Sequence, residues 1–282
     1  MISQLTGACI RAALVILMIA LPSLLLTEVT SEVKQMTALI ALFATVFVLV
    51  EYLSIYPGLV EFRDAPPFNR VRFGMVFCTV LVLSLAARDM TDPTLLTRFF
   101  TAIGALMGVA LDFPLSPIRA AMVLASDETS SALALRRAAG LGYLTALVTL
   151  SVFAILIRLR GWPLPAESFN IWINLPNFDP TRTTDVVKRL KRSARINILL
   201  GCLLPYLVPV VLQVFYAQFG IHLTGTGHAL IWTTTLWAFL PTAYFMRGIA
   251  MLRLASMLAA KQARLAPEDG EFALSSGSPQ LA

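Results

Sequence analysis

Long apolar runs dominate the pattern of hydrophobic and polar positions along this chain of 282 residues. A helix needs about 20 apolar residues to cross a hydrocarbon core of about 30 Å, and six runs approach or reach that length. We expect membrane-spanning helices over residues 12–27, 36–56, 73–87, 139–157, 196–218 and 229–249. The sequence therefore predicts an all-α polytopic membrane protein, with residues 1–249 as its membrane domain.

A further apolar stretch, residues 93–113, is harder to assign. Its uncharged part between Arg98 and Asp112 would reach only about 20 Å as a helix, which is less than the hydrocarbon thickness. Gly104 and Gly108 form a GxxxG pair, which would let another helix approach closely. We expect a short re-entrant or interfacial helix packed against protein, and the alternative is a seventh transmembrane helix.

The cations orient the chain, because Lys and Arg in short loops favour the cytoplasmic side of a membrane. In a six-span arrangement both termini lie in the cytoplasm, together with three arginines at 63–72 and the basic segment 158–195. In a seven-span arrangement the totals hardly change, but the three arginines of the short 63–72 loop move outside. We therefore favour six spans and a cytoplasmic C-terminus.

Composition supports a membrane protein and argues against a nucleic-acid-binding one. Hydrophobic residues make up 57% of the chain and charged residues 13%, whereas soluble domains carry about 25% charged residues. The net charge of +6 is explained by cations at span ends, and no motif of a nucleic-acid reader is present. The preference for Arg over Lys is typical of GC-rich bacterial genomes, so the expected location is the bacterial cytoplasmic (inner) membrane.

Residues 158–195 form the largest predicted cytoplasmic loop and the most basic one. Near its end Val187, Leu190 and Ala194 share one helical face, which predicts an interfacial helix on the headgroups before the span at 196. We expect this loop to contact anionic lipids or a protein partner. The candidate contact residues are Lys188, Arg189, Lys191, Arg192, Arg195, Trp162 and Trp172.

The chain after the last span is expected to leave the membrane in two parts. Residues 250–265 keep an apolar stripe of Met251, Leu254 and Leu258, which predicts a second interfacial helix. Residues 266–282 have few bulky side chains, and this composition is typical of a disordered tail.

Glu51, Gln213 and Thr234 are the polar candidates within the spans. An acid in a membrane span is a functional hypothesis by default. Tyr52, however, suggests that the water interface lies close to Glu51, so a structural role or a pair with Arg11 are alternatives. Gln213 and the threonines at 233–235 could line a polar cavity between the last two spans.

Catalytic, metal-binding and cofactor-binding motifs are absent from the sequence. It has no GxSxG, no HExxH and no glycine-rich phosphate loop, and its three cysteines are scattered. We therefore expect no cofactor and favour a non-catalytic assembly, scaffolding or accessory subunit that works with other membrane proteins. One alternative is a small transporter or permease component. Another is a membrane enzyme acting on lipid through Glu51 or the acids Asp89 and Asp92.

Overall fold

The computed structural model describes residues 2–55, 58–125, 129–159, 162, 174–175, 185–220 and 227–275, with side chains from 4 to 263. All regular structure within these ranges is helical, and six of the helices are long and apolar enough to cross a membrane. The fold class predicted from the sequence, an all-α polytopic membrane protein, is confirmed.

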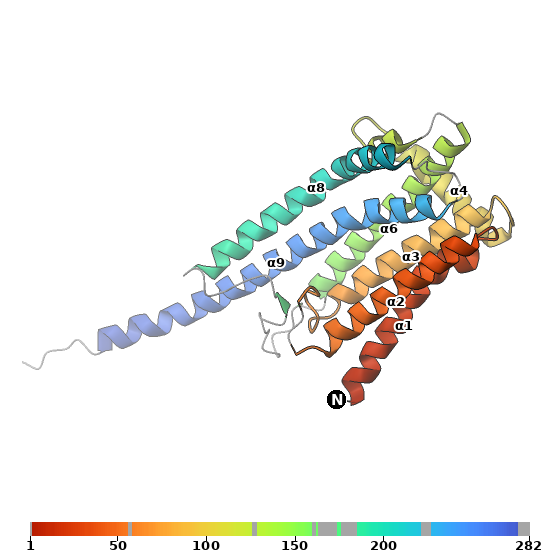
Figure 1. The fold of residues 1–282 in the computed structure, drawn as a ribbon. Helices are drawn as coiled ribbons and strands as arrows, with labels where there is room; N and C mark the ends of the chain where they lie inside the picture. The colour runs from red at the N-terminus through yellow and green to blue at the C-terminus, as the bar shows by residue number, and fades with distance from the viewer. Residues whose placement is uncertain are drawn as a thin grey trace, which may run out of the picture.

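The six long helices run alternately in opposite directions through one bundle (Figure 1). They are α1 (Ile2–Leu25), α2 (Ser31–Leu53), α3 (Phe68–Arg88), α6 (Thr129–Leu159), α8 (Val186–Phe219) and α9 (His228–Ser275). The start of α1, the α2–α3 connection and the last turns of α9 lie at one end of the bundle, which we call the terminal end. The α1–α2 and α3–α6 connections lie at the opposite end, the connector end.

The short helix α4 (Leu95–Ala110) does not cross the bundle. α3 and α6 are antiparallel, since Thr79 bonds to Thr145 at 2.9 Å while the ring of Phe68 meets that of Phe153 toward the terminal end. The last residue of α3 and the first of α6 therefore lie at the same end, so the chain between them makes no net crossing of the bundle. The assignment of six full spans is confirmed, with α4 as the short additional helix.

The GxxxG pair of α4 packs backbone to backbone on α6. A Cβ atom added to Gly140 would lie 2.5 Å from the amide nitrogen of Gly108 and 2.6 Å from the carbonyl oxygen of Gly104. Only hydrogen fits at these three positions, so the glycines allow α4 to lie directly against α6. The prediction that this segment packs against protein is confirmed.

Capping side chains start the short helices at the connector end. Thr94 and Thr97 form a capping box at the start of α4. Ser116 accepts the N–H of Arg119 at 3.1 Å, and Pro117 occupies the first turn of α5 (Pro117–Ala121). A short 3-10 helix, η1 (Met122–Leu124), follows directly, so the chain turns within a few residues before α6.

α8 and α9 are longer than a bilayer requires and extend as an antiparallel pair past the terminal end (Figure 1). α8 has 34 residues and α9 has 48, all in unbroken helices. Val187, Leu190 and Ala194 of α8 are buried in one cluster with Met251 and Leu254 of α9. We call the paired parts, α8 before Ile196 and α9 after Arg247, the stalk.

Three segments that the sequence places outside the spans belong at least in part to the two stalk helices. The basic segment before 196 and residues 250–265, each predicted to form an interfacial helix, directly continue the last two spans. Each apolar stripe is buried against the other stripe, so neither needs the membrane surface. Residues 266–275, expected in a disordered tail, continue α9, and residues 276–282 lie outside the described ranges.

Pro209, one of two prolines within α8, is accommodated by α9. Pro209 has no N–H, so the carbonyl of Pro205 four residues earlier lacks its helical donor. The indole N–H of Trp237 donates to this carbonyl at 2.9 Å. The helix stays continuous in the lipid region because a neighbouring helix satisfies the freed group.

We predict that Gly140→Ala destabilises the protein by about 1–3 kcal/mol, because the added methyl group overlaps the backbone of α4. Thermal unfolding in mild detergent, followed by size-exclusion chromatography, measures this effect. Gly74→Ala is the matched control, since a Cβ at Gly74 meets nothing within 4 Å. Equal midpoints for the two variants would contradict the close α4–α6 packing.

Candidate functional site

A group of charged side chains is gathered at the terminal end of the bundle, where the chain between α2 and α3 folds against α9. Glu51 and Glu61 are only 7% and 8% exposed. Arg63 and Arg247 bond to the segments that carry these acids, and Arg72 interacts electrostatically with Glu61. We call these five residues the charge cluster.

Glu51 lies at the end of α2, and backbone donors occupy its carboxylate. Oε1 accepts the N–H of Gly58 at 3.3 Å, and Oε2 accepts the N–H groups of the next two residues at 3.1 Å each. These bonds fold the chain back onto the end of α2. Arg11, the alternative partner considered from the sequence, stacks instead over the ring of Tyr52, 4.6 Å from its centroid.

Arg63 caps the C-terminal end of α2. Its guanidinium donates to the carbonyl oxygens of Glu51, Ser54 and Ile55 at 3.1, 2.7 and 3.2 Å. The last carbonyls of a helix have no intrahelical donor and carry partial negative charge, so a cation at this position satisfies both needs.

Arg247 connects the α2–α3 segment to both stalk helices. Its Nε and Nη2 atoms donate to the two carboxylate oxygens of Glu61 at 2.6 and 2.7 Å, and Nη1 donates to Oδ1 of Asn197 at 3.0 Å. Asn197 is 2% exposed and donates in turn to the Ser193 carbonyl of α8 at 2.7 Å. The bidentate pair thereby fixes three segments at the base of the stalk.

Aromatic side chains pack beside the charge cluster. Phe62 is fully buried, has a left-handed φ of 54°, and donates its N–H to the Asn174 carbonyl at 2.7 Å. Its ring lies 4.4 Å from that of Phe68 and 5.6 Å from that of Trp162, measured between centroids. The guanidinium of Arg72 lies 5.5 Å above the Phe68 ring.

The structure places Trp162 differently from the sequence prediction. It is 2% exposed, and its indole N–H donates to the Ala65 carbonyl at 3.2 Å. Its own carbonyl accepts Nε of Arg253 on α9 at 3.0 Å. The indole ring of Trp162 is thus packed within the protein, and its N–H group already has a hydrogen-bond acceptor there. Trp172, the other candidate aromatic, lies outside the described residues.

The predicted cationic contacts lie together on the outer side of α8 in the stalk. Lys188, Lys191, Arg192 and Arg195 are exposed, whereas Val187 faces inward. A surface groove of about 520 Å³ runs along this helix and is lined by Asp185, Lys188, Arg189, Arg192, Ser193 and Ile196. Asp185 also caps α8 by accepting the N–H of Lys188 at 2.9 Å. The grouping of these cations is as the sequence suggested, while their function stays a prediction.

The structure does not bring Gln213 and Thr234 together. Gln213 is exposed on the outside of α8. Thr234 is 2% exposed and faces α6, where its methyl group would lie 2.9 Å from a Cβ on Gly142. Its neighbour Thr233 bonds to Tyr216 of α8. The threonine run therefore contributes to helix packing and does not face Gln213 across a polar cavity.

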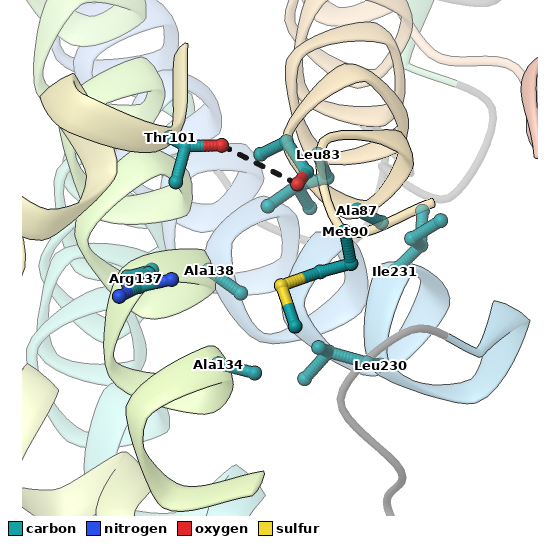
Figure 2. A pocket seen from close by; sticks show the side chains of 10 residues that line it. Leu83, Ala87, Met90, Thr101, Ala134, Arg137, Ala138, Leu230 and Ile231 are labelled. Atoms are coloured by element: carbon teal, nitrogen blue, oxygen red, sulfur yellow. Dashed lines mark hydrogen bonds between the residues drawn. The ribbon is translucent and has the colours of Figure 1, made fainter. Parts of the chain in front are cut away.

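The acids proposed for a lipid enzyme have structural partners. Asp89 accepts the hydroxyl of Thr97 at 2.8 Å, and Asp92 pairs with Arg88. Within the described ranges, no three His, Cys, Asp or Glu side chains are grouped as a metal site would require. A cavity of about 40 Å³ lies at the connector end. The side chain of Met90 is among those that line it (Figure 2). Its lining is mostly apolar and its volume is too small for an ordinary ligand.

Comparison of the chain with protein-family models, with curated proteins and with solved structures gives no match. The proposed function therefore rests on the structure alone.

Sequence reasoning missed the pair of Glu61 and Arg247, which are separated by 186 positions. One signal was present: Arg247 interrupts an apolar run, and a cation in such a place normally has a partner inside the protein. The identity of that partner needed the fold, because several acids lie near other span ends.

We predict that Glu61→Gln destabilises the protein by about 2–3 kcal/mol, since it leaves the partly buried Arg247 charge without its carboxylate. The double variant Glu61→Gln/Arg247→Gln should recover part of this loss. Thermal unfolding in detergent measures both. Arg88→Gln, which breaks the more exposed Arg88–Asp92 pair, is the control and should cost at most about 1 kcal/mol. A Glu61→Gln effect no larger than the control would show that the pair does not fix the stalk.

Proposed function

We propose that this integral membrane protein is a non-catalytic scaffolding or accessory subunit of a membrane complex, which presents its stalk to an acidic protein partner. The observation that carries the proposal is the stalk itself. Two spans continue past the bundle as one packed pair, with their apolar residues inside and a row of cations outside. Such a pair offers a rigid, charged surface without requiring catalysis.

The distribution of cations supports a cytoplasmic position for the stalk. Arg11, Arg63, Arg70 and Arg158 lie at the same terminal end as the stalk cations. The cations of the connector end are fewer: Lys34, Arg88, Arg98, Arg119, Arg136 and Arg137. Positively charged ends face the cytoplasm, so we infer a cytoplasmic C-terminus in a bacterial inner membrane.

The length of α8 favours a protein partner for the outer part of the stalk. A rise of about 1.5 Å per residue puts Lys188 about 12 Å beyond Ile196, where the apolar part of α8 begins. The headgroup layer on each side of the hydrocarbon is only about 5–8 Å thick. Arg195 and Arg192 are thus positioned for anionic headgroups, while Lys188 and Arg189 extend into water.

The charge cluster supports the same function, because it fixes the stalk to the bundle. Arg247 joins α9 to Glu61 and to Asn197 of α8 just where the pair leaves the other helices. A partner that binds the stalk would therefore be held at a defined angle to the membrane. By contrast, Gln213 and Thr234 do not form a polar pathway, so the transporter alternative has less support.

We predict that Lys188→Gln/Arg192→Gln greatly reduces recovery of a membrane partner when the protein is purified in mild detergent. Neutralising two cations of the basic groove removes the electrostatic attraction to an acidic surface. The same partner should be released in 1 M salt, where the screening length is about 3 Å. Quantitative mass spectrometry of the purified material measures both effects.

Lys34→Gln/Arg98→Gln is the matched control, because it removes two exposed cations from the connector end. This variant should retain the partner. Equal recovery with both double variants, or a homogeneous protein with no stoichiometric partner, would refute the scaffold function. Binding only to vesicles of anionic lipid would assign the cations to the membrane surface instead.

A further inference from the structure

α6 and α8 pack on α9 but hardly touch each other, so a gap separates them along the bundle. Near the connector end α5 and η1 fill this gap by packing on both α6 and α8. On the terminal side of these two elements the gap stays open as a groove of about 350 Å³. Trp237, Pro241 and Phe245 of α9 form the floor of the groove, and Pro117 of α5 closes it at the connector end.

The groove opens sideways into the region occupied by lipid. Two residues of its rim, Leu147 of α6 and Tyr206 of α8, are each 40% exposed and lie within the apolar stretches of their spans. The groove is therefore continuous with the protein surface that contacts the bilayer. Its lining is overwhelmingly apolar, which suits hydrocarbon and excludes a hydrated solute.

The dimensions of the groove fit one lipid chain in one leaflet. Trp237 and Phe245, at the two ends of the floor, are eight residues apart and thus about 12 Å along α9. The hydrocarbon of one leaflet is about 15 Å deep. Pro117 closes the groove toward the connector end, so a chain that lies in it has its headgroup toward the terminal end.

Two cations mark the level at which the headgroup of such a lipid would lie. Arg158 follows the groove residue Leu147 by eleven positions on α6, and Arg195 precedes Tyr206 by eleven positions on α8. Eleven residues are about three helical turns, so each arginine continues the groove-lining side of its helix toward the terminal end. Both arginines are exposed.

The geometry points to a phospholipid-binding site: one acyl chain lies in the groove between α6 and α8, and the phosphate lies between Arg158 and Arg195. The lipid belongs to the leaflet at the terminal end. This site goes beyond the scaffolding function, because it needs neither the outer part of the stalk nor a protein partner. The apolar lining binds the chain, and the two guanidinium groups select a phosphate headgroup.

We test the site with Cys202→Phe, because Cys202 lines the groove and is exposed, so a ring placed there enters the space assigned to the chain. Val211→Phe is the matched control, since Val211 is 65% exposed on another side of α8. Both proteins are purified from membranes in mild detergent, and retained phospholipid is counted by native mass spectrometry. We expect one phospholipid per unaltered chain and per control chain. Occupancy in Cys202→Phe should be about tenfold lower, equivalent to losing the burial of about two methylene groups. Equal occupancy in the two variants would overturn the proposal.

A second measurement needs no variant and therefore does not depend on how Cys202→Phe folds. The unaltered protein is placed in vesicles of phosphatidylethanolamine and phosphatidylglycerol, with a trace of phospholipid carrying a photoreactive diazirine in one acyl chain. After illumination, peptide mapping should find labels concentrated on Leu147, Leu150 and Phe245. An even spread over lipid-facing residues such as Val211 and Leu42 would show annular lipid only and would overturn the site. Loss of partner binding in the stalk variants leaves both readouts unchanged, so the two proposals fail separately.

Discussion

Hydrocarbon offers no hydrogen-bond partner to a peptide group, and this constraint shapes the whole of this protein. Each lipid-exposed segment is a helix, in which the backbone satisfies itself. Pro209 of α8 supplies no donor, and the side chain of Trp237 on the next helix donates instead to the carbonyl of Pro205. In the part of the chain that the structure describes, irregular segments lie toward the two ends of the bundle.

At the terminal end the buried charged groups are engaged with the protein itself. Glu51 and Arg63 complete the end of α2, while Glu61 and Arg247 join the α2–α3 segment to α9. Buried acids in a membrane protein raise the expectation of proton or ion handling, but here each carboxylate has a structural set of donors. Exposed cations lie on the stalk, among them Lys188 and Arg192, and also at the ends of neighbouring helices. This arrangement supports the proposed role in binding a partner.

The sequence was sufficient for the spans because their signal is local: a long apolar run must be a helix in lipid. It was also sufficient for the packing of α4, since Gly104 and Gly108 have few other uses on one helical face. It did not reveal the pairing of the stalk helices, because an amphipathic stripe shows that a helix buries one face and does not show what covers that face. Val187 and Met251 cover each other across more than sixty positions, and the Glu61–Arg247 pair spans even more. Such long-range pairings have no local signal, which is also why Trp162 was expected at a surface and is found in the core.

The unequal lengths of the helices have a mechanical consequence. From Arg247 to Ser275, α9 continues for 28 residues without a break, which corresponds to about 42 Å. A tilt of about 10° at its base would displace its tip by about 7 Å. α9 therefore has the geometry of a long arm that pivots at the base of the stalk, where Arg247 is attached to both neighbouring segments. Small rearrangements among the spans would become large movements at the tip of this helix.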